Sequence, residues 1–188
     1  MSGEPRVSTR RTFLLHVHLR DIQPMIWRRL MVPGSLTLTK LHFVLQGAFD
    51  WEGYHLHGFE IDGLRYGPGE DDYDERELDE DEWRLFQLIN VDDHFIYKYD
   101  FGDNWIHDIH VEGAENTSLT LKKALCLDGA RARPPEDVGG PSGFEHFLEV
   151  MNDPSHTEHD GLMQWHGSEY RQDNFSIYDT NAQVQSRS

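Results

Sequence analysis

Apolar and polar residues alternate near the start of the chain. From Phe13 to Leu19 every second residue is apolar, which is the period of a strand with one buried face, so residues 12–20 predict a β-strand. Residues 25–32 predict a second strand, which ends at Pro33-Gly34. The short, proline-containing link between the two stretches favours antiparallel neighbours.

Two β-hairpins are predicted in the middle of the chain. Residues 55–61 and 64–66 flank Asp62-Gly63, a strong signal for a tight two-residue turn. Residues 95–101 alternate again, and after a glycine-containing turn residues 105–112 alternate back. These four stretches add to the sheet that the first two strands begin.

Helical spacing marks the other elements. Apolar residues recur every three or four positions over residues 38–49, with Thr37 in place as the N-cap, and a short helix is predicted over residues 83–88. Two capping-box pairs predict later helices: Ser142 with Glu145 for a helix to about Asn152, and Ser155 with Glu158 for a helix through Trp165 that Gly167 closes.

The order of these elements predicts an α+β fold. Strands come in antiparallel pairs rather than in βαβ units, so we expect a mixed or antiparallel sheet with helices packed on one face. Residues 174–178 are the last predicted strand. We expect one domain over residues 12–179, a flexible N-terminus over residues 1–11, and a frayed tail over residues 180–188.

Charge and composition narrow the class of protein. The 188 residues hold 17 Lys and Arg against 34 Asp and Glu, a net charge of −17, which argues against nucleic acid as a partner. No apolar run has the roughly 20 residues that a membrane span needs, and no signal peptide is evident. Cys126 is the single cysteine, which fits a reducing compartment. These features together predict a cytoplasmic protein.

Residues 70–82 carry ten of the acidic side chains within thirteen positions. A block of like charges repels itself, so a solvated loop is the ordinary interpretation. A cation-binding or partner-docking arm is the alternative.

Several short motifs resemble those of a known family. Together they look like the plasmid pRi open-reading-frame-three-like family, whose members are also labelled insertion-element passenger proteins of the TnpR type, and the likeness runs from about Arg11 to Asp179. The resemblance implies a roll-like α+β fold and implies little about activity. The motifs appear in this order: Pro24-Met25-Ile26-Trp27-Arg28-Arg29, Leu41-His42, Trp51, His55-Leu56-His57-Gly58-Phe59, Tyr99-Asp100-Phe101-Gly102-Asp103-Asn104-Trp105-Ile106-His107 and Pro134-Pro135-Glu136-Asp137-Val138-Gly139-Gly140.

The TnpR label does not predict a recombinase. A serine recombinase needs a nucleophilic serine supported by several arginines, and a basic DNA-binding tail. Residues 170–188 contain only Arg171 and Arg187 as basic residues.

Two of these motifs contain the candidate metal ligands. His55 and His57 would face the same side of a strand, and Asp100, Asp103 and His107 surround the second predicted hairpin turn, so these five are the candidate ligands of a divalent metal. The alternative is that Asp100 or Asp103 only pairs with Arg28 or Arg29 on a neighbouring strand. Trp27 and Trp105 are candidate walls of the same cleft.

The prolines and glycines of residues 134–140 suggest a rigid loop. Such a loop can direct Glu136 and Asp137 into a cleft, where either carboxylate is a candidate catalytic base. It can equally be a structural turn whose carboxylates cap backbone amides or pair with Arg131 and Arg133.

The sequence leaves three functions open. The first is a non-enzymatic binding or accessory module, carried with plasmids or mobile elements, whose acidic cleft takes a basic protein or a small cationic ligand. The second is a metal-dependent hydrolase with a His/Asp site. The third is a purely structural polar network without a ligand.

Overall fold

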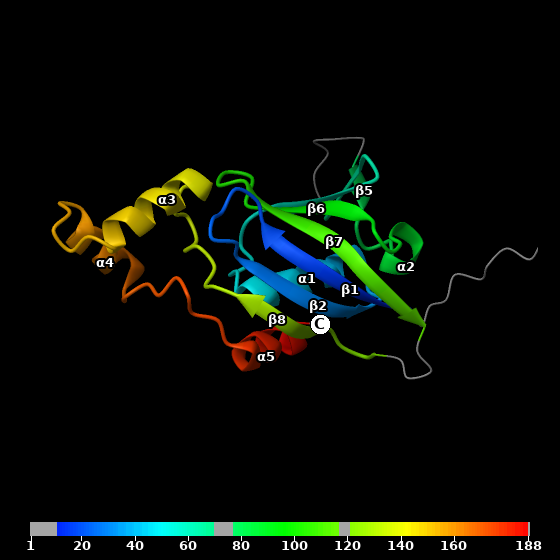
Figure 1. Ribbon diagram of the computed structural model, residues 1–188. Helices are drawn as coiled ribbons and strands as arrows, with labels where there is room; N and C mark the ends of the chain where they lie inside the picture. The colour runs from blue at the N-terminus through cyan, green and yellow to red at the C-terminus, as the bar shows by residue number, and fades with distance from the viewer. Residues whose placement is uncertain (1–10, 70–76, 117–120, 188) are drawn as a thin grey trace, which may run out of the picture.

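One twisted sheet forms the body of the protein (Figure 1). The computed structural model describes residues 11–69, 77–116 and 121–187. Over these residues the strand order is β5-β4-β3-β6-β7-β1-β2-β8, antiparallel throughout except for the parallel pair of β4 and β5. The strands are β1 (Arg11–Leu19), β2 (Trp27–Pro33), β3 (His57–Ile61), β4 (Leu64–Gly67), β5 (Glu77–Asp79), β6 (His94–Tyr99), β7 (Trp105–Asn116) and β8 (Leu125–Ala130).

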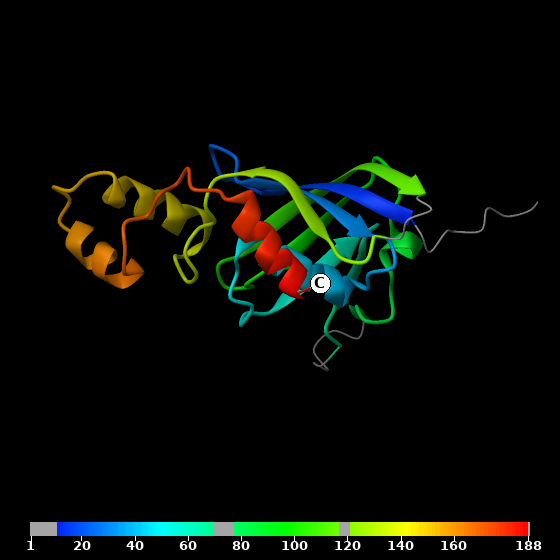
Figure 2. The same cartoon turned by 90° about the horizontal axis from the view of Figure 1, so that it is seen from below.

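The helices occupy two places relative to this sheet. The described helices are α1 (Leu38–Phe49), α2 (Leu85–Leu88), α3 (Gly140–Met151), α4 (His159–His166) and α5 (Ile177–Arg187). In both views α1 and α5 lie together against one face of the sheet, whereas α3 and α4 form a pair beyond one end of it (Figures 1 and 2). The predicted α+β class is therefore confirmed.

The core lies between the sheet and α1. The apolar side of β1, from Phe13 to Leu19, is buried, as its alternating pattern predicts. Thr37 caps α1 by accepting a hydrogen bond from the backbone N–H of Lys40. Aromatic residues complete the core on the side where the strand ends meet the loops: Phe49, Trp51, Tyr97, Tyr99 and Trp105.

The end of the chain differs from the sequence-based expectation. Residues 174–178 form no strand, because Ile177 begins helix α5. Residues up to Arg187 are helical rather than frayed, and Val184 is fully buried. Ile177 and Val184 are seven residues apart, so two helical turns place them on the same face. The expected flexible N-terminus falls on residues 1–10, which lie outside the described residues, and on Arg11, which already belongs to β1.

Strand β8 is an element that the periodicity does not predict. It pairs with β2, and its Cys126 is buried, which raises the pKa of the thiol. On its other side, the Asn181 amide of α5 bonds both backbone groups of Cys126, accepting from N–H and donating to C=O at 2.8 Å each. At Cys126 the edge of this strand is thus capped by a side chain.

The two predicted capping boxes are wrong. Helix α3 begins after Gly139, whose φ of 94° requires glycine, and no side chain caps it. Before α4, Ser155 bonds Asp153 rather than a helix N–H, and the N-cap Glu158 makes no capping hydrogen bond. The predicted extents of both helices nevertheless agree with the structure to within a few residues.

Close contact between α1 and α5 gives the first prediction. A Cβ atom on Gly47 would lie 2.9 Å from backbone atoms of Gln183 and Val184, so Gly47→Ala must push the two helices apart. We expect it to lower the free energy of unfolding by about 1–3 kcal/mol. Gly161→Ala in α4 is the matched control, because nothing lies within 4 Å of its added Cβ. The control should be neutral or stabilise by about 0.5–1 kcal/mol, as alanine normally does in a helix. Urea unfolding of both variants tests this, and a stable Gly47→Ala would contradict the close packing.

None of the helices over the described residues is long and apolar enough to span a membrane.

Candidate metal centre

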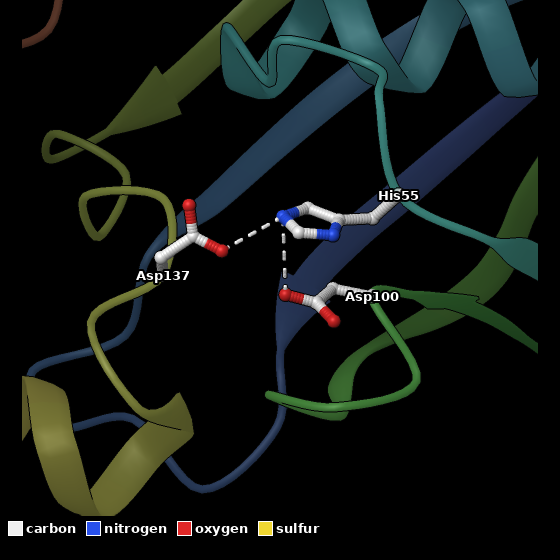
Figure 3. Close-up of side chains that lie close together, drawn as sticks. All are labelled: His55, Asp100 and Asp137. Carbon is white, nitrogen blue, oxygen red and sulfur yellow. Dashed lines mark ion pairs between the residues drawn. The ribbon is translucent and has the colours of Figure 1, made fainter.

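Three loops meet at one corner of the sheet (Figure 3). His55 lies in the connection between α1 and β3, Asp100 follows the end of β6, and Asp137 lies in the segment that leads into α3. The side chains come from separate segments and point toward one another. The fold therefore gathers one imidazole and two carboxylates from distant parts of the sequence.

The distances within this cluster are short. His55 Nε2 lies 3.0 Å from Asp137 Oδ1 and 3.4 Å from Asp100 Oδ2. The three residues can each offer one ligand atom, and these atoms lie within 4.8 Å of one another. Asp100 is almost fully buried, whereas the Asp137 side chain is 60% exposed, so the cluster is open to solvent on the Asp137 side.

Glu136 adds a third carboxylate beside this cluster. Its Oε1 accepts hydrogen bonds from the Glu52 backbone N–H at 2.7 Å and from the Tyr99 hydroxyl at 3.2 Å. Its Oε2 lies 3.8 Å from His55 Nε2. Glu136 is only 8% exposed, and burial raises its pKa. Burial also raises the pKa of Tyr99, to about 12, so its hydroxyl stays protonated and available as the donor to Glu136.

Two atoms of this cluster lack hydrogen-bond partners. His55 Nε2 and Glu136 Oε2 are both buried, and neither makes a hydrogen bond to any described residue. A buried polar atom without a partner costs about 1–3 kcal/mol, so native proteins seldom leave one unexplained. Here the two unpartnered atoms face each other.

Asp103 and the glycines of the 134–140 loop hold this arrangement in place. Asp103 accepts a hydrogen bond from the Gly139 N–H at 3.0 Å, and a Cβ on Gly140 would lie 2.4 Å from the Asp103 carbonyl oxygen. Asp100 Oδ1 accepts from the N–H groups of Gly102 and Asp103, which leaves Oδ2 toward His55. Asp103 therefore positions the loop and does not itself join the cluster.

His57 and His107 lie apart from His55. The prediction that His55 and His57 share a strand face is wrong, because β3 begins only at His57 and His55 lies in the preceding loop. His57 Nε2 lies 3.1 Å from Glu80 Oε1, and its ring stacks on that of His42 with centroids 3.5 Å apart. His107 is fully buried and accepts a hydrogen bond from Trp51 Nε1 at 3.0 Å.

Glu80 comes from the acidic block. Residues 70–76 lie outside the described residues, but from Glu77 the block forms β5, and Glu80 is only 2% exposed. The expectation of a solvated loop is therefore wrong for the backbone of β5 and for Glu80, whereas Glu77, Asp79, Asp81 and Glu82 are exposed as expected. No sequence motif distinguishes Glu80 from the other acidic residues of the block. What distinguishes it is its contact with His57, which only the folded structure shows.

The arginines do not pair with the hairpin carboxylates. Arg28 donates to four backbone carbonyls, and Arg29 pairs with Glu112, so the alternative pairing of either with Asp100 or Asp103 is wrong. The predicted pairing of Glu136 or Asp137 with Arg131 or Arg133 is not among the observed ion pairs of the described residues. Glu136 does cap a backbone amide, as the structural interpretation of the loop expects.

The two tryptophans proposed as cleft walls lie elsewhere. Trp27 stacks on His16, with ring centroids 5.3 Å apart. Trp105 is fully buried against Trp51. Besides Tyr99, Tyr54 contacts the centre, donating a hydrogen bond to Asp137 Oδ2 at 2.9 Å. The sequence feature that could have identified Tyr54 as a site residue is its position next to His55.

The fold and this cluster define an α+β protein in which three sequence motifs meet at one polar corner. The chain matches the family described as plasmid pRiA4b ORF-3-like protein over residues 11–179, and it belongs to that family. The motifs around His55, Asp100 and Asp137 are among those that carry the resemblance.

Two relatives extend this finding. The chain is 35% identical over 158 residues to the uncharacterized protein y4hQ of Sinorhizobium fredii (strain NBRC 101917 / NGR234), a match that covers 82% of this chain and 80% of that one. It is also similar to the crystal structure of the protein of unknown function MM3350 from Methanosarcina mazei Go1. That similarity has a TM-score of 0.81 and 32% identity, and it covers 90% of this chain and 97% of the other.

Proposed function

We propose that this protein binds a divalent transition-metal ion at His55, Asp100 and Asp137. The observation that carries the proposal is the buried His55 Nε2, which has no hydrogen-bond partner although three carboxylates surround it. A cation between these groups would satisfy the imidazole lone pair and would remove the repulsion among the carboxylates.

The distances support a shared ion. Ligand atoms about 2.1 Å from one octahedral ion lie about 3 Å apart when adjacent. The separations of 3.0 and 3.4 Å from His55 Nε2 to the aspartates fit such a shell. Imidazole favours zinc, iron, nickel and copper, whereas carboxylates suit manganese and magnesium, so the mixed set favours Mn²⁺, Fe²⁺ or Zn²⁺.

This proposal makes the partner expected of an acidic protein more specific. The net charge of −17 predicts a basic protein or a small cationic ligand. The cluster supports a small cationic ligand, because its carboxylates converge on a single point and are not spread over a broad surface. The binding role at this corner does not by itself require catalysis.

Metal analysis tests the proposal. Protein purified without a tag or chelator should carry about one Mn, Fe or Zn ion per chain by mass spectrometry. His55→Ala should weaken metal binding by more than about 100-fold in calorimetric titrations, since even outer-shell partners of a metal contribute 10- to 100-fold. The matched control is His146→Ala, an exposed histidine that also lies 3.1 Å from a carboxylate, on Glu158. Equal metal affinity in the two variants, or no bound metal in the wild type, would refute the site.

A further inference from the structure

Glu136 is held differently from the two aspartates. One of its oxygens is fixed by the Glu52 N–H and the Tyr99 hydroxyl, while the other is buried, without a partner, and directed toward His55. At 3.8 Å, Oε2 is farther from His55 Nε2 than either aspartate oxygen is. The ligand atoms of His55, Asp100 and Asp137 all lie within 4.8 Å of one another, and Glu136 is not a member of that set, so Glu136 stands beside the ligands rather than among them.

We propose that the centre hydrolyses an uncharged acyl substrate, a carboxylic ester or amide, with Glu136 as the proton acceptor. This inference rests on the proposed metal binding. An ion held by His55, Asp100 and Asp137 would supply a Lewis acid that makes water more acidic. Glu136 Oε2 takes a proton from the attacking water as the water oxygen bonds to the acyl carbon, and the carbonyl π electrons move to the carbonyl oxygen. When the tetrahedral species collapses, the bond to the leaving alcohol or amine breaks, and Glu136 returns the proton to that group. Water and the ester or amide are consumed, and an acid with an alcohol or amine is formed.

From sequence alone, Glu136 and Asp137 are equal candidates for the base. The structure separates their roles. Asp137 offers an oxygen at 3.0 Å from His55 Nε2, within ligand spacing, and its other oxygen accepts from Tyr54. Glu136 keeps one oxygen free and has its other anchored, which fixes the direction of the free one.

The charge of the centre selects against anionic substrates. Two aspartates neutralise a divalent ion, and Glu136 brings the total to −1 within a chain of −17. Arg133, which precedes the loop, is engaged with the carbonyl oxygens of Asp50 and Pro134. A phosphate ester would therefore meet net negative charge at the centre, and Arg133, the arginine next to this loop among the described residues, is already engaged. A neutral acyl group would meet no such repulsion.

An aromatic side chain stands next to the ligands. The Tyr54 ring lies 4.3 Å from the His55 ring between centroids, its hydroxyl donates to Asp137, and the residue is 57% exposed. An exposed aromatic residue beside a polar centre provides surface for the apolar part of a substrate. This favours an acyl group with a hydrocarbon or aromatic chain.

The test uses the full chain loaded with Mn²⁺ or Zn²⁺. Probes are p-nitrophenyl butyrate, a neutral ester, and bis(p-nitrophenyl) phosphate, an anion. Wild type should hydrolyse the ester with metal-dependent kcat and prefer it over the phosphate. Glu136→Gln should bind metal within about threefold of wild type and lose on the order of 10²- to 10⁴-fold in kcat. Glu149→Gln is the control, because Glu149 is an exposed carboxylate on α3, and it should change neither the metal affinity nor kcat.

The outcomes separate the two proposals. Bound metal without ester hydrolysis, or with hydrolysis that Glu136→Gln leaves intact, overturns the catalytic inference and leaves metal binding in place. Because activated esters react more readily than amides, an amide-cleaving centre would also act on this probe. Loss of metal in Glu136→Gln makes Glu136 a ligand and overturns its role as base. Preference for the phosphate overturns the substrate class, and absence of bound metal in the wild type refutes both proposals.

Discussion

Trp51→Ala is expected to lower the free energy of unfolding by about 4 kcal/mol. The Trp51 side chain is fully buried, and its ring packs against those of Tyr99 and Trp105, with centroids 5.2 and 5.7 Å away. Truncation leaves a cavity and removes the donor to buried His107 Nε2. Thermal unfolding should shift down by roughly 10 °C for a chain of this length.

Two variants separate packing from hydrogen bonding at this position. Trp51→Phe keeps most of the ring volume but not the N–H donor, so it should lose about 1–3 kcal/mol. Trp165→Ala is the matched control, because Trp165 is 49% exposed, and it should cost less than about 1 kcal/mol. Similar losses at positions 51 and 165 would show that Trp51 is not part of the core.

Acid should destabilise the protein well above the range where carboxylates titrate. Burial lowers the pKa of both His42 and His107 to about 3, from the ordinary 6.5. Below pH 6.5 the unfolded chain binds a proton at each histidine and the folded chain does not, so stability falls as pH falls from 6.5 toward 3. Between pH 6.5 and 4.5 the loss should reach about 4 kcal/mol, measured by urea unfolding of metal-free protein.

Other titratable groups change the stability in other pH ranges or in the opposite direction. Hydrogen bonds from Arg20 and Arg29 lower the pKa values of Asp108 and Glu112, so these carboxylates lose their stabilising contributions only below the unfolded values near 4. The raised pKa of Glu136 acts oppositely and stabilises the folded chain as pH falls. His107→Gln isolates the contribution of one histidine, because it should reduce the slope of the free energy of unfolding against pH by the equivalent of about one proton. An unchanged slope would contradict the assignment to His107.

The parts of the fold that the sequence predicts well are those with strong local signals. Residues 12–20 alternate without interruption, and the apolar spacing of residues 38–49 is helical, so β1 and α1 lie where expected. Asp62 and Gly63 both adopt positive φ in the first hairpin, as the turn chemistry requires.

The missed elements depend on distant contacts. The three residues of β5 are mostly acidic, and only their pairing with β4 makes them a strand. Helix α5 has few apolar residues, and its place follows from its packing on α1. Local composition reveals neither contact, because α1 and α5 lie far apart along the chain and the pairing of β4 with β5 spans 12 residues.

The sequence predicts which residues are candidates for the site, but not which of them lie together in the fold. His55, Asp100, Glu136 and Asp137 were all marked as candidates, and the structure brings them together. His57, Asp103 and His107 belong to other contacts. Strand alternation would place His55 beside His57, but β3 begins only at His57. The loop that precedes β3 turns His55 instead toward Asp137.

The bond between Asn181 and Cys126 has a consequence for how molecules meet in solution. An outermost strand with free N–H and C=O groups is a template on which another chain can align and aggregate. At Cys126 both of these groups are already occupied by one side-chain amide from α5. The C-terminal helix therefore does more than cover the core: at Cys126 it occupies the backbone groups with which a strand of another molecule would pair.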